Sequence, residues 1–501
     1  MNAPLRRVGV VVLVLFAMLF ANLNWVQAYK SDDYRTDDHN TRVQTAEYQR
    51  ERGKIIVGGE AVAQSIETAD NLKYLRQYPF KEQYAHLVGY KPVNLGATGI
   101  EKLENDYLSG NANSQVDDRI AAIFTGAKPA GGNIELSISK AAQETAYREL
   151  VNNKQKAVKG AVVALDPKTG AVLAAIAIPT YDPNPMVSHN FKEAEAAYNR
   201  LDADPAKPLL NRAFSETFPP GSTMKVIIAA AALANGATPQ TLMRAGPRYE
   251  PPQTGGFFIK NAAASICPEA QVTLKEALTE SCNTAFARYG VENLGIDKVK
   301  QMAQSFGFES VPGIDLDEKN IYNVATSRHG AMTGPDGKVD PPALAQSCIG
   351  QKDVRMTPLQ GALIASTVAS GGEQLRPYLV QSLKTADLTT TDYVAKREVM
   401  RRSISGQIAA DLQDMMISVV ENGTGKPAKI AGFRVGGKTG TAENADDAED
   451  HGWFIGFAAK GNDPVVAISV FLENAGKGGS AEAARIAGLV MQSVIRERGL
   501  R

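Results

Sequence analysis

The sequence predicts an α+β fold in which strands from both ends of a large C-terminal region share one antiparallel sheet. Two pairs of apolar runs, around the turns 166–170 and 460–464, are each typical of a β-hairpin. Between them, the run 226–233 is apolar on nearly every side, as in a buried helix. A closing helix is expected at 480–496, and strands at both ends with helices between them favour one α+β domain. The expected strands are 161–165, 171–177, 453–458 and 465–471.

The composition limits the class of protein. A chain of 501 residues can hold two or three domains, and its formal net charge of +0 predicts no surface for nucleic acid. Cys267, Cys282 and Cys348 are too few for a disulfide framework, and the cysteine and histidine spacing predicts no metal site. Cys267 and Cys282 could pair in an oxidising compartment, or they could be two buried thiols.

The N-terminus predicts one membrane-spanning helix. Two arginines precede the apolar run 8–21, and Trp25 follows at the depth of a membrane interface. Residues 1–28 would then be a cytoplasmic start and a single-pass anchor in the inner-membrane lipid bilayer. A cleaved signal peptide is the alternative, because the segment 26–28 offers small residues to a peptidase. Both interpretations place the rest of the chain on the extracytoplasmic side.

Residues 29–154 are expected to form a separate, non-catalytic module. Its start is polar and charged up to about residue 52, as in a solvated stalk. A strand-like stretch at 52–57, a strand at 134–138 and a helix at 141–150 follow. The module contains no pattern of nucleophile and base, which favours a role as a pedestal or as a partner-binding surface.

The stretch 218–233 contains the first candidate for chemistry. Pro219-Pro220-Gly221 ends any earlier element, and Ser222 is expected to open the helix as its N-cap. Lys225 lies three residues later, on the same helix face. A hydroxyl beside an amine is a nucleophile beside its base, provided that the amine has lost its proton. For an isolated match, a capping serine followed by a surface lysine is the better interpretation.

Two further motifs change that interpretation. Ser281-Cys282-Asn283 and then Lys438-Thr439-Gly440 follow along the chain. Ser-x-x-Lys, Ser-x-Asn and Lys-Thr-Gly, in this order, are the motifs of penicillin-binding proteins and serine β-lactamases. From about residue 155 to its end the sequence resembles class B penicillin-binding proteins. The segment that begins Arg52-Gly53 resembles the start of their N-terminal module.

The resemblance implies an architecture. A transpeptidase domain at 155–501 would contain an antiparallel sheet flanked by helices, together with a helical subdomain. A pedestal or dimerisation module would occupy 29–154, and the transmembrane helix would lie within 1–28.

The resemblance also implies catalytic roles. Ser222 would attack the D-Ala-D-Ala carbonyl with Lys225 as general base. Ser281 would pass the proton to the leaving D-Ala. Asn283 would either hydrogen-bond the substrate amide or hold Lys225 in place.

Substrate-binding roles are implied for the third motif. Lys438 and Thr439 would hold the terminal carboxylate, and Gly440 would let the strand approach it closely. The backbone N–H groups of Ser222 and Thr441 would form the oxyanion hole. Burial and the charge of Lys438 are the two expected causes of a lowered Lys225 pKa.

The reaction implied is D,D-transpeptidation of peptidoglycan stem peptides, inhibited covalently by β-lactam antibiotics and requiring no metal or cofactor. A SEDS-family glycosyltransferase and other divisome or elongasome proteins are the implied partners. A D,D-carboxypeptidase and a non-catalytic scaffold of the cell-wall machinery are the alternatives. A β-lactamase is disfavoured because its deacylating carboxylate is not assignable.

The segment 432–439 also fits the phosphate-binding pattern Gly-x4-Gly-Lys-Thr. A P-loop requires an apolar strand before it and a helix from its lysine onward. The preceding segment 426–430 is a poor central strand, and the acidic run 443–450 would repel a nucleotide. A strand at the edge of an active site is the better interpretation of this segment.

Overall fold

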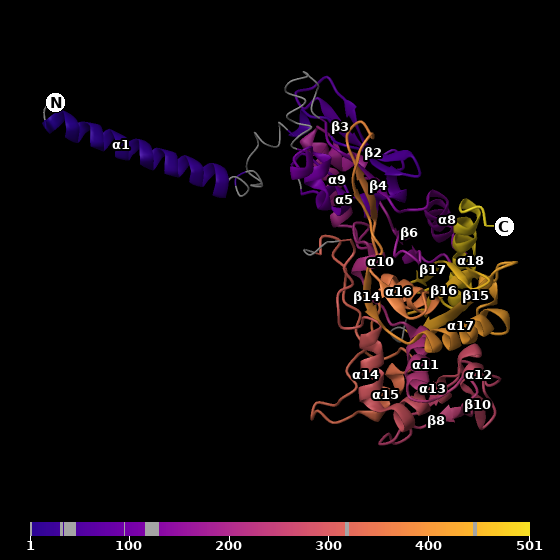
Figure 1. Ribbon diagram of the computed structural model, residues 1–501. Coiled ribbons are helices and arrows are strands. Elements are labelled where there is room, and N and C mark those ends of the chain that lie inside the picture. Colours follow the sequence, from indigo (N-terminus) through magenta and orange to yellow (C-terminus); the bar gives the residue numbers. More distant parts are fainter. Residues whose placement is uncertain are drawn as a thin grey trace.

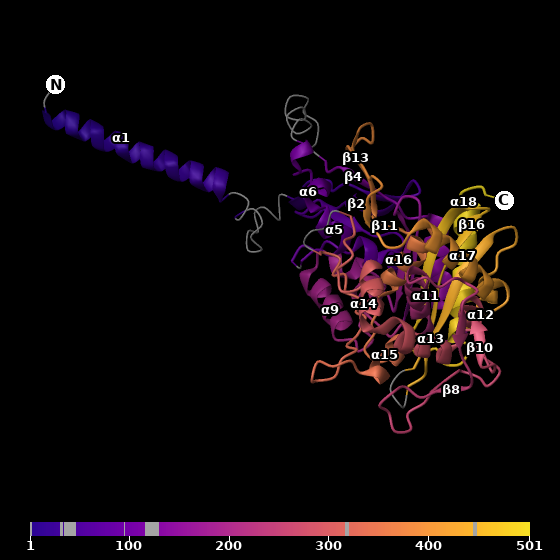
Figure 2. The same cartoon turned by 60° about the horizontal axis from the view of Figure 1, so that its bottom comes forward.

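The computed structural model describes residues 3–30, 34, 47–94, 96–115, 130–315, 320–443 and 448–500 (Figures 1 and 2). Among these residues the longer strands form two sheets. The first sheet lies with the N-terminal module, and the second lies between this module and a helical region (Figure 1).

The N-terminal helix α1 (Ala3–Asn24) continues as a π-helical turn over Trp25–Tyr29. The segment Arg6–Tyr29 has a mean hydropathy of 2.2, is long enough to cross a membrane and is not buried against the protein. The predicted apolar helix is therefore confirmed, and it is compatible with both an anchor and a signal sequence. Most of the predicted stalk lies outside the described residues.

The first sheet has the strand order β13-β12-β4-β1-β2-β3. The strand β1 pairs in parallel with β4, and the other pairs are antiparallel. Its strands β12 and β13 come from far along the chain, and Figure 1 shows their hairpin beside β4. The strands are β1 (Ile55–Val57), β2 (Glu60–Glu67), β3 (Tyr74–Gln77), β4 (Asn133–Leu136), β12 (Val380–Lys384) and β13 (Thr391–Val394).

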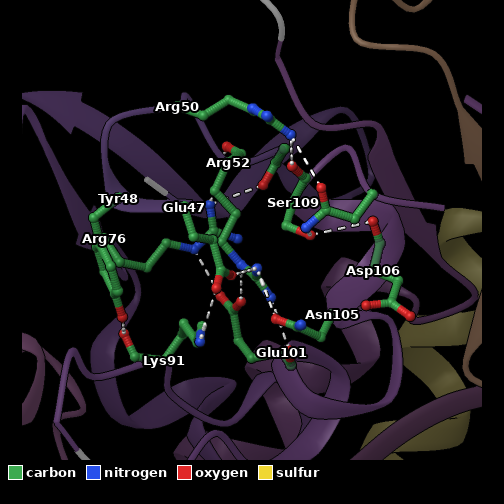
Figure 3. A network of polar contacts seen from close by, with 12 residues as sticks. Glu47, Tyr48, Arg50, Arg52, Arg76, Lys91, Glu101, Asn105, Asp106 and Ser109 are labelled. Atoms are coloured by element: carbon green, nitrogen blue, oxygen red, sulfur yellow. Dashed lines mark hydrogen bonds and ion pairs between the residues drawn. The ribbon is translucent and has the colours of Figure 1, made fainter. Parts of the chain in front are cut away.

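Short helices support this sheet and supply a buried carboxylate. Glu101, on α5, lies between two arginines and accepts hydrogen bonds from Arg52 Nε at 2.7 Å and Arg76 Nε at 2.6 Å (Figure 3). The Tyr78 hydroxyl donates a third hydrogen bond to the same carboxylate. All four side chains are buried, so this charge cluster is part of the module's core. The helices are α4 (Ala85–Val88), α5 (Gly99–Leu103) and α6 (Asn105–Leu108).

The second sheet has the antiparallel order β15-β16-β17-β5-β6 within the described part of the chain. Both predicted hairpins are confirmed, and the pairing of β17 with β5 joins the two ends of the C-terminal region. Helices α8 and α18 pack on one face and α16 on the other. The elements are β5 (Gly160–Leu165), β6 (Val172–Ile178), β15 (Arg434–Ala442), β16 (His451–Lys460), β17 (Asp463–Leu472), α8 (Lys140–Val151), α16 (Pro358–Ala369) and α18 (Gly479–Glu497).

Most of the remaining helices form the helical region below the second sheet, whereas α9 lies with the N-terminal module (Figure 1). Helix α11 is fully apolar after its first residue and lies at the centre of the largest hydrophobic core. The helices are α9 (Phe191–Asp202), α10 (Arg212–Ser215), α11 (Lys225–Ala234), α12 (Leu274–Thr279), α13 (Asn283–Tyr289), α14 (Gly295–Ser305), α15 (Pro341–Ser347) and α17 (Gly406–Glu421). The short strands are β7 (Leu242–Arg244), β8 (Arg248–Tyr249), β9 (Ile259–Lys260), β10 (Gln271–Thr273), β11 (Glu373–Leu375) and β14 (Val399–Arg402).

Candidate active site

Ser222 lies in a tight turn between the second sheet and α11. The 3-10 turn Gly221–Met224 leads directly into the helix, and Met224 rather than Ser222 occupies the N-cap position. The prediction that Ser222 caps the helix is therefore wrong. Tertiary contacts hold the turn instead: the Gly221 N–H donates to the Gly350 carbonyl at 2.9 Å. The Ser222 hydroxyl is consequently free to meet Lys225.

The sheet fits closely against this turn. Gly221 has φ +52°, and a Cβ there would lie 2.3 Å from the Thr441 carbonyl oxygen. A Cβ on Gly440 would lie 2.7 Å from the Pro220 carbonyl oxygen. Both glycines are therefore needed for the approach of β15 to the serine turn. The predicted role of Gly440 in letting the strand approach the substrate carboxylate stays a prediction.

Lys225 connects the first two motifs, and its side chain is fully buried. Its Nζ lies 3.1 Å from Ser222 Oγ and 3.2 Å from Ser281 Oγ. The same nitrogen lies 2.7 Å from the Ser281 carbonyl oxygen and 2.6 Å from Asn283 Oδ1. The interpretation of this residue as a surface lysine is therefore excluded by its burial.

The four partners of Lys225 suit an unprotonated amine. The Ser281 carbonyl and Asn283 Oδ1 can only accept hydrogen bonds, whereas a hydroxyl can also donate. A neutral amine can give its two protons to these two acceptors and keep its lone pair for the Ser222 hydroxyl. Burial lowers the pKa of Lys225 to about 7, because a charged amine loses its hydration there. A large fraction of Lys225 is thus available as a base at neutral pH.

Ser281 stands between the two lysines. Its Oγ lies 3.2 Å from Lys225 Nζ and 2.9 Å from Lys438 Nζ. Ser281 follows the end of α12 and precedes α13, as the sequence predicts, but its φ of +64° lies in the left-handed region. This conformation is uncommon for a non-glycine residue, and it was not foreseen from the sequence. It aims both the hydroxyl and the carbonyl of Ser281 at Lys225.

Asn283 opens α13 beside the same lysine. Its Oδ1 accepts from Lys225, while its Nδ2 donates to the Lys260 carbonyl at 2.9 Å. This contact with Lys225 is compatible with the second of the two predicted roles, and a hydrogen bond from Asn283 to the substrate amide stays a prediction. The contact with β9 could not be found from sequence, because nothing in the segment around Lys260 marks it as a partner.

The third motif lies on β15, at the edge of the second sheet. Lys438 pairs with Ile455 within an unbroken strand, so no helix starts at this lysine and the P-loop interpretation is excluded. Lys438 is fully buried and donates to Ser281 Oγ and to the Thr439 carbonyl at 3.0 Å. Thr439 is buried too, whereas Thr441 is exposed and its Oγ lies 3.5 Å from Ser480 Oγ.

The two lysines have no ion-pair partner among the described residues. Burial, and then the charge of Lys225, lower the pKa of Lys438 well below its usual value. Burial is therefore the largest cause of the lowered pKa of both lysines, as expected for Lys225, and a contribution from the charge of Lys438 to the pKa of Lys225 stays a prediction.

Several residues that contact the site lie outside the three motifs. Trp453, on β16, donates from Nε1 to the Pro219 carbonyl at 2.9 Å and so supports the serine turn. The hydroxyl of Thr424 lies 2.5 Å from that of Thr439. Cys267 and Cys282 are free buried thiols rather than a disulfide. In the parts of the chain described, acidic, histidine and cysteine side chains form no group that could hold a metal ion.

Comparisons with known proteins identify the family of this chain. The family described as penicillin binding protein transpeptidase domain matches residues 160–492, and the penicillin binding protein A dimerisation domain matches residues 52–134. The chain is 41% identical to peptidoglycan D,D-transpeptidase PbpA of Mycolicibacterium smegmatis, over 99% of this chain and 100% of that protein. It is 39% identical to PbpA of Mycobacterium tuberculosis, over 99% and 98% of the two chains.

A solved structure gives the same result for the fold. The imipenem acyl-enzyme complex of penicillin-binding protein A from M. tuberculosis superposes with a TM-score of 0.83 at 39% identity. The match covers 90% of this chain and 100% of that one. Sequence, fold and the three motifs together show that this chain belongs to the penicillin-binding protein transpeptidase family.

Proposed function

We propose that this chain is a serine-type peptidoglycan D,D-transpeptidase of cell-wall synthesis, with Ser222 as its nucleophile. The observation that carries the proposal is the 3.1 Å contact between Ser222 Oγ and the buried amine of Lys225, which has no ion-pair partner among the described residues. Relatives named peptidoglycan D,D-transpeptidase along essentially the whole chain support the reaction class. A relative's structure as an imipenem acyl-enzyme supports β-lactams as covalent inhibitors.

Acylation begins with the hydroxyl of Ser222. The neutral amine of Lys225 takes its proton while Oγ attacks the carbonyl carbon between the two D-alanines of a stem peptide. The backbone N–H groups of Ser222 and Thr441 stabilise the oxyanion. The closeness of the Gly221 turn to Thr441 supports this pairing.

The leaving D-Ala needs a proton when the C–N bond breaks. Ser281 Oγ gives its proton to that nitrogen and receives one from a lysine, since both lysine amines lie within 3.2 Å of it. In the second half-reaction the amine of a neighbouring stem peptide attacks the Ser222 ester. The new amide forms, and the proton removed from that amine restores the serine hydroxyl. Lys438 and Thr439 hold the free carboxylate of the donor, and Gly440 gives it room beside β15.

The proposed location of the chain is the cell membrane. Residues 1–28 anchor the chain in the cell membrane by a single pass, and the pedestal at 29–154 and transpeptidase domain at 155–501 lie on the extracytoplasmic side. The apolar helix Arg6–Tyr29 supports the anchor. A SEDS-family glycosyltransferase and further divisome or elongasome proteins are the proposed partners.

Mass spectrometry of the intact protein tests the nucleophile. After treatment with penicillin G the wild-type protein should gain the mass of one adduct, and Ser222→Ala should gain none. An adduct that persists in Ser222→Ala contradicts the assignment, and an unlabelled wild-type protein favours the non-catalytic scaffold. A thioester donor with added D-amino acid then separates transpeptidation from hydrolysis, because the product of a carboxypeptidase would be the free acid alone.

A further inference from the structure

A threonine outside the three motifs touches the candidate carboxylate site. Thr424 follows α17, and its Oγ lies 2.5 Å from Oγ of Thr439 on β15. Thr439 is 5% exposed, whereas Thr424 is exposed. The two hydroxyls therefore form a pair in which Thr424 is the outer member. Fourteen intervening residues separate them in the sequence, so no motif predicts the pair.

The loop that carries Thr424 is fixed on both sides by glycines. The Gly423 N–H donates to the carbonyls of Ser418 and Val419, and the Gly425 N–H donates to the carbonyl of Val419 at 2.9 Å. A Cβ on Gly423 would lie 2.2 Å from the carbonyl oxygen of Thr279, the last residue of α12. The position of Thr424 is therefore tied to the element that leads into Ser281.

The direction of donation in this hydrogen bond decides whether Thr439 can also donate to an anion. Each hydroxyl has one proton to donate and can also accept. If Thr439 donates to Thr424, no proton of Thr439 remains for an anion. If Thr424 donates to Thr439, the Thr439 proton is free, and its hydrogen bond to an anion is strengthened by the chain of donors.

The surroundings of Lys438 make a hydroxyl donor to the carboxylate more important. The Nζ of Lys438 already donates to Ser281 Oγ and to the Thr439 carbonyl. Burial lowers its pKa well below the usual value, so its charge is a weaker attraction for a carboxylate than that of an exposed lysine. Hydroxyl donors therefore matter more for anion binding here.

We propose that Thr424 is a positioning residue for the terminal carboxylate of the acyl donor. Its hydroxyl donates to Thr439 Oγ, and Thr439 in turn donates to the carboxylate. This inference rests on the proposed transpeptidase function and extends it to a residue outside the motifs. It predicts that Thr424 affects only ligands that carry the free carboxylate.

The test compares penicillin G, which has the carboxylate, with its methyl ester, which lacks the negative charge. Rate constants for acylation of Ser222 are measured by quenched intact-mass spectrometry of the full-length protein. In Thr424→Val the second-order rate constant for penicillin G should fall about 10-fold, the effect of weakening one charge-assisted hydrogen bond. The rate constant for the methyl ester should change less than about 2-fold. Thr424→Ser should restore the wild-type ratio, because it keeps the hydroxyl.

A matched control is Thr389→Val, which removes an exposed hydroxyl that bonds only Asp387 within its own loop. It should leave both rate constants unchanged. Because the ratio of the two ligands is internal to each sample, partial misfolding of a variant cancels. Equal losses for both ligands in Thr424→Val would overturn the proposal in favour of a structural role, and so would no loss for either. Failure of the proposed function itself would appear differently, as a wild-type protein that neither ligand acylates.

Discussion

The pedestal and the active site both bury positive side chains, but only the pedestal also buries a negative one. In the pedestal, Arg52 and Arg76 share the carboxylate of Glu101, which is itself fully buried (Figure 3). In the active site, Lys225 and Lys438 share only the hydroxyl of Ser281. Removing a charge from water costs free energy in both regions. The pedestal offsets this cost with an opposite charge, whereas the active site offers its lysines neutral partners such as the Ser281 hydroxyl.

The pKa values record the difference. Burial alone would raise the pKa of Glu101, but the charges of Arg76 and Arg52 and their hydrogen bonds place it below its usual value. Glu101 therefore remains charged at neutral pH. The lysines of the active site have no carboxylate, so burial lowers their pKa values. A buried charge with an oppositely charged partner contributes to the fold. A buried lysine without such a partner loses its proton more readily and can therefore act as a base.

The largest expected effect is on the acylation rate, in a variant of the active-site lysine. Lys225→Met keeps most of the buried volume but removes the base, so acylation by penicillin G should slow about 10³-fold. The loss of stability should stay below that of Glu101→Leu, because Lys225→Met leaves the Ser281 carbonyl and Asn283 Oδ1 without a donor but leaves no buried charge without its partner. Stopped-flow or quenched mass measurements give the rate, with exposed Lys298→Met as the control. Acylation within 10-fold of wild type would show that Lys225 is not the base.

The pedestal should respond in the opposite way. Glu101→Leu leaves Arg52 and Arg76 buried without their carboxylate, which should destabilise the protein by about 3–5 kcal/mol. Thermal and urea unfolding measure this loss, while the folded protein should be acylated at the wild-type rate. Glu60→Leu is the matched control, because its ion pair with Lys140 is exposed and contributes about 1 kcal/mol or less. Equal effects of the two variants would remove the distinction between the regions.

The pH dependence of the two regions should also differ. Lys225 must be neutral to act, so acylation should rise about tenfold per pH unit below its pKa of about 7 and level off above it. Because Glu101 has a lowered pKa, its stabilisation is complete above the usual glutamate value of about 4.3 and is lost as the pH falls through its lower folded-state pKa.

The variant Lys438→Ala sharpens this prediction. It should lower the plateau rate while the rising limb stays near pH 7, because burial is the largest cause of the lowered pKa of Lys225. A rising limb displaced to higher pH in this variant would show that the neighbouring charge matters. Rates of penicillin G acylation between pH 5 and pH 9 distinguish the outcomes.

The smallest expected effects come from removing the polar group of a single aromatic side chain in each region. Trp453→Phe removes the donor to the Pro219 carbonyl and should slow acylation less than about tenfold, since one such bond contributes about 1 kcal/mol. Tyr78→Phe removes one donor to Glu101 and the acceptor of the Lys91 N–H, and it should lower stability by about 2 kcal/mol without slowing acylation. A slower acylation in Tyr78→Phe would indicate coupling between the pedestal and the active site.

Local patterns in the sequence determined much of this protein. The two hairpins, the apolar helix α11 and the N-terminal helix follow from the periodicity of apolar residues, and the structure confirms them. The family follows from the order of Ser222, Ser281 and Lys438 along the chain. These features depend on residues close together in sequence, or on short motifs that carry their own chemistry.

Only the tertiary structure decided how those pieces act together. It buries Lys225 completely, gives Ser281 its left-handed backbone and adds β12 and β13 to the first sheet. It also replaces the predicted N-cap at Ser222 by a turn that fits against β15. The pKa of a lysine and the backbone conformation of a loop residue depend on groups that are distant in sequence. No local pattern contains that information, because burial is a property of the whole packed chain.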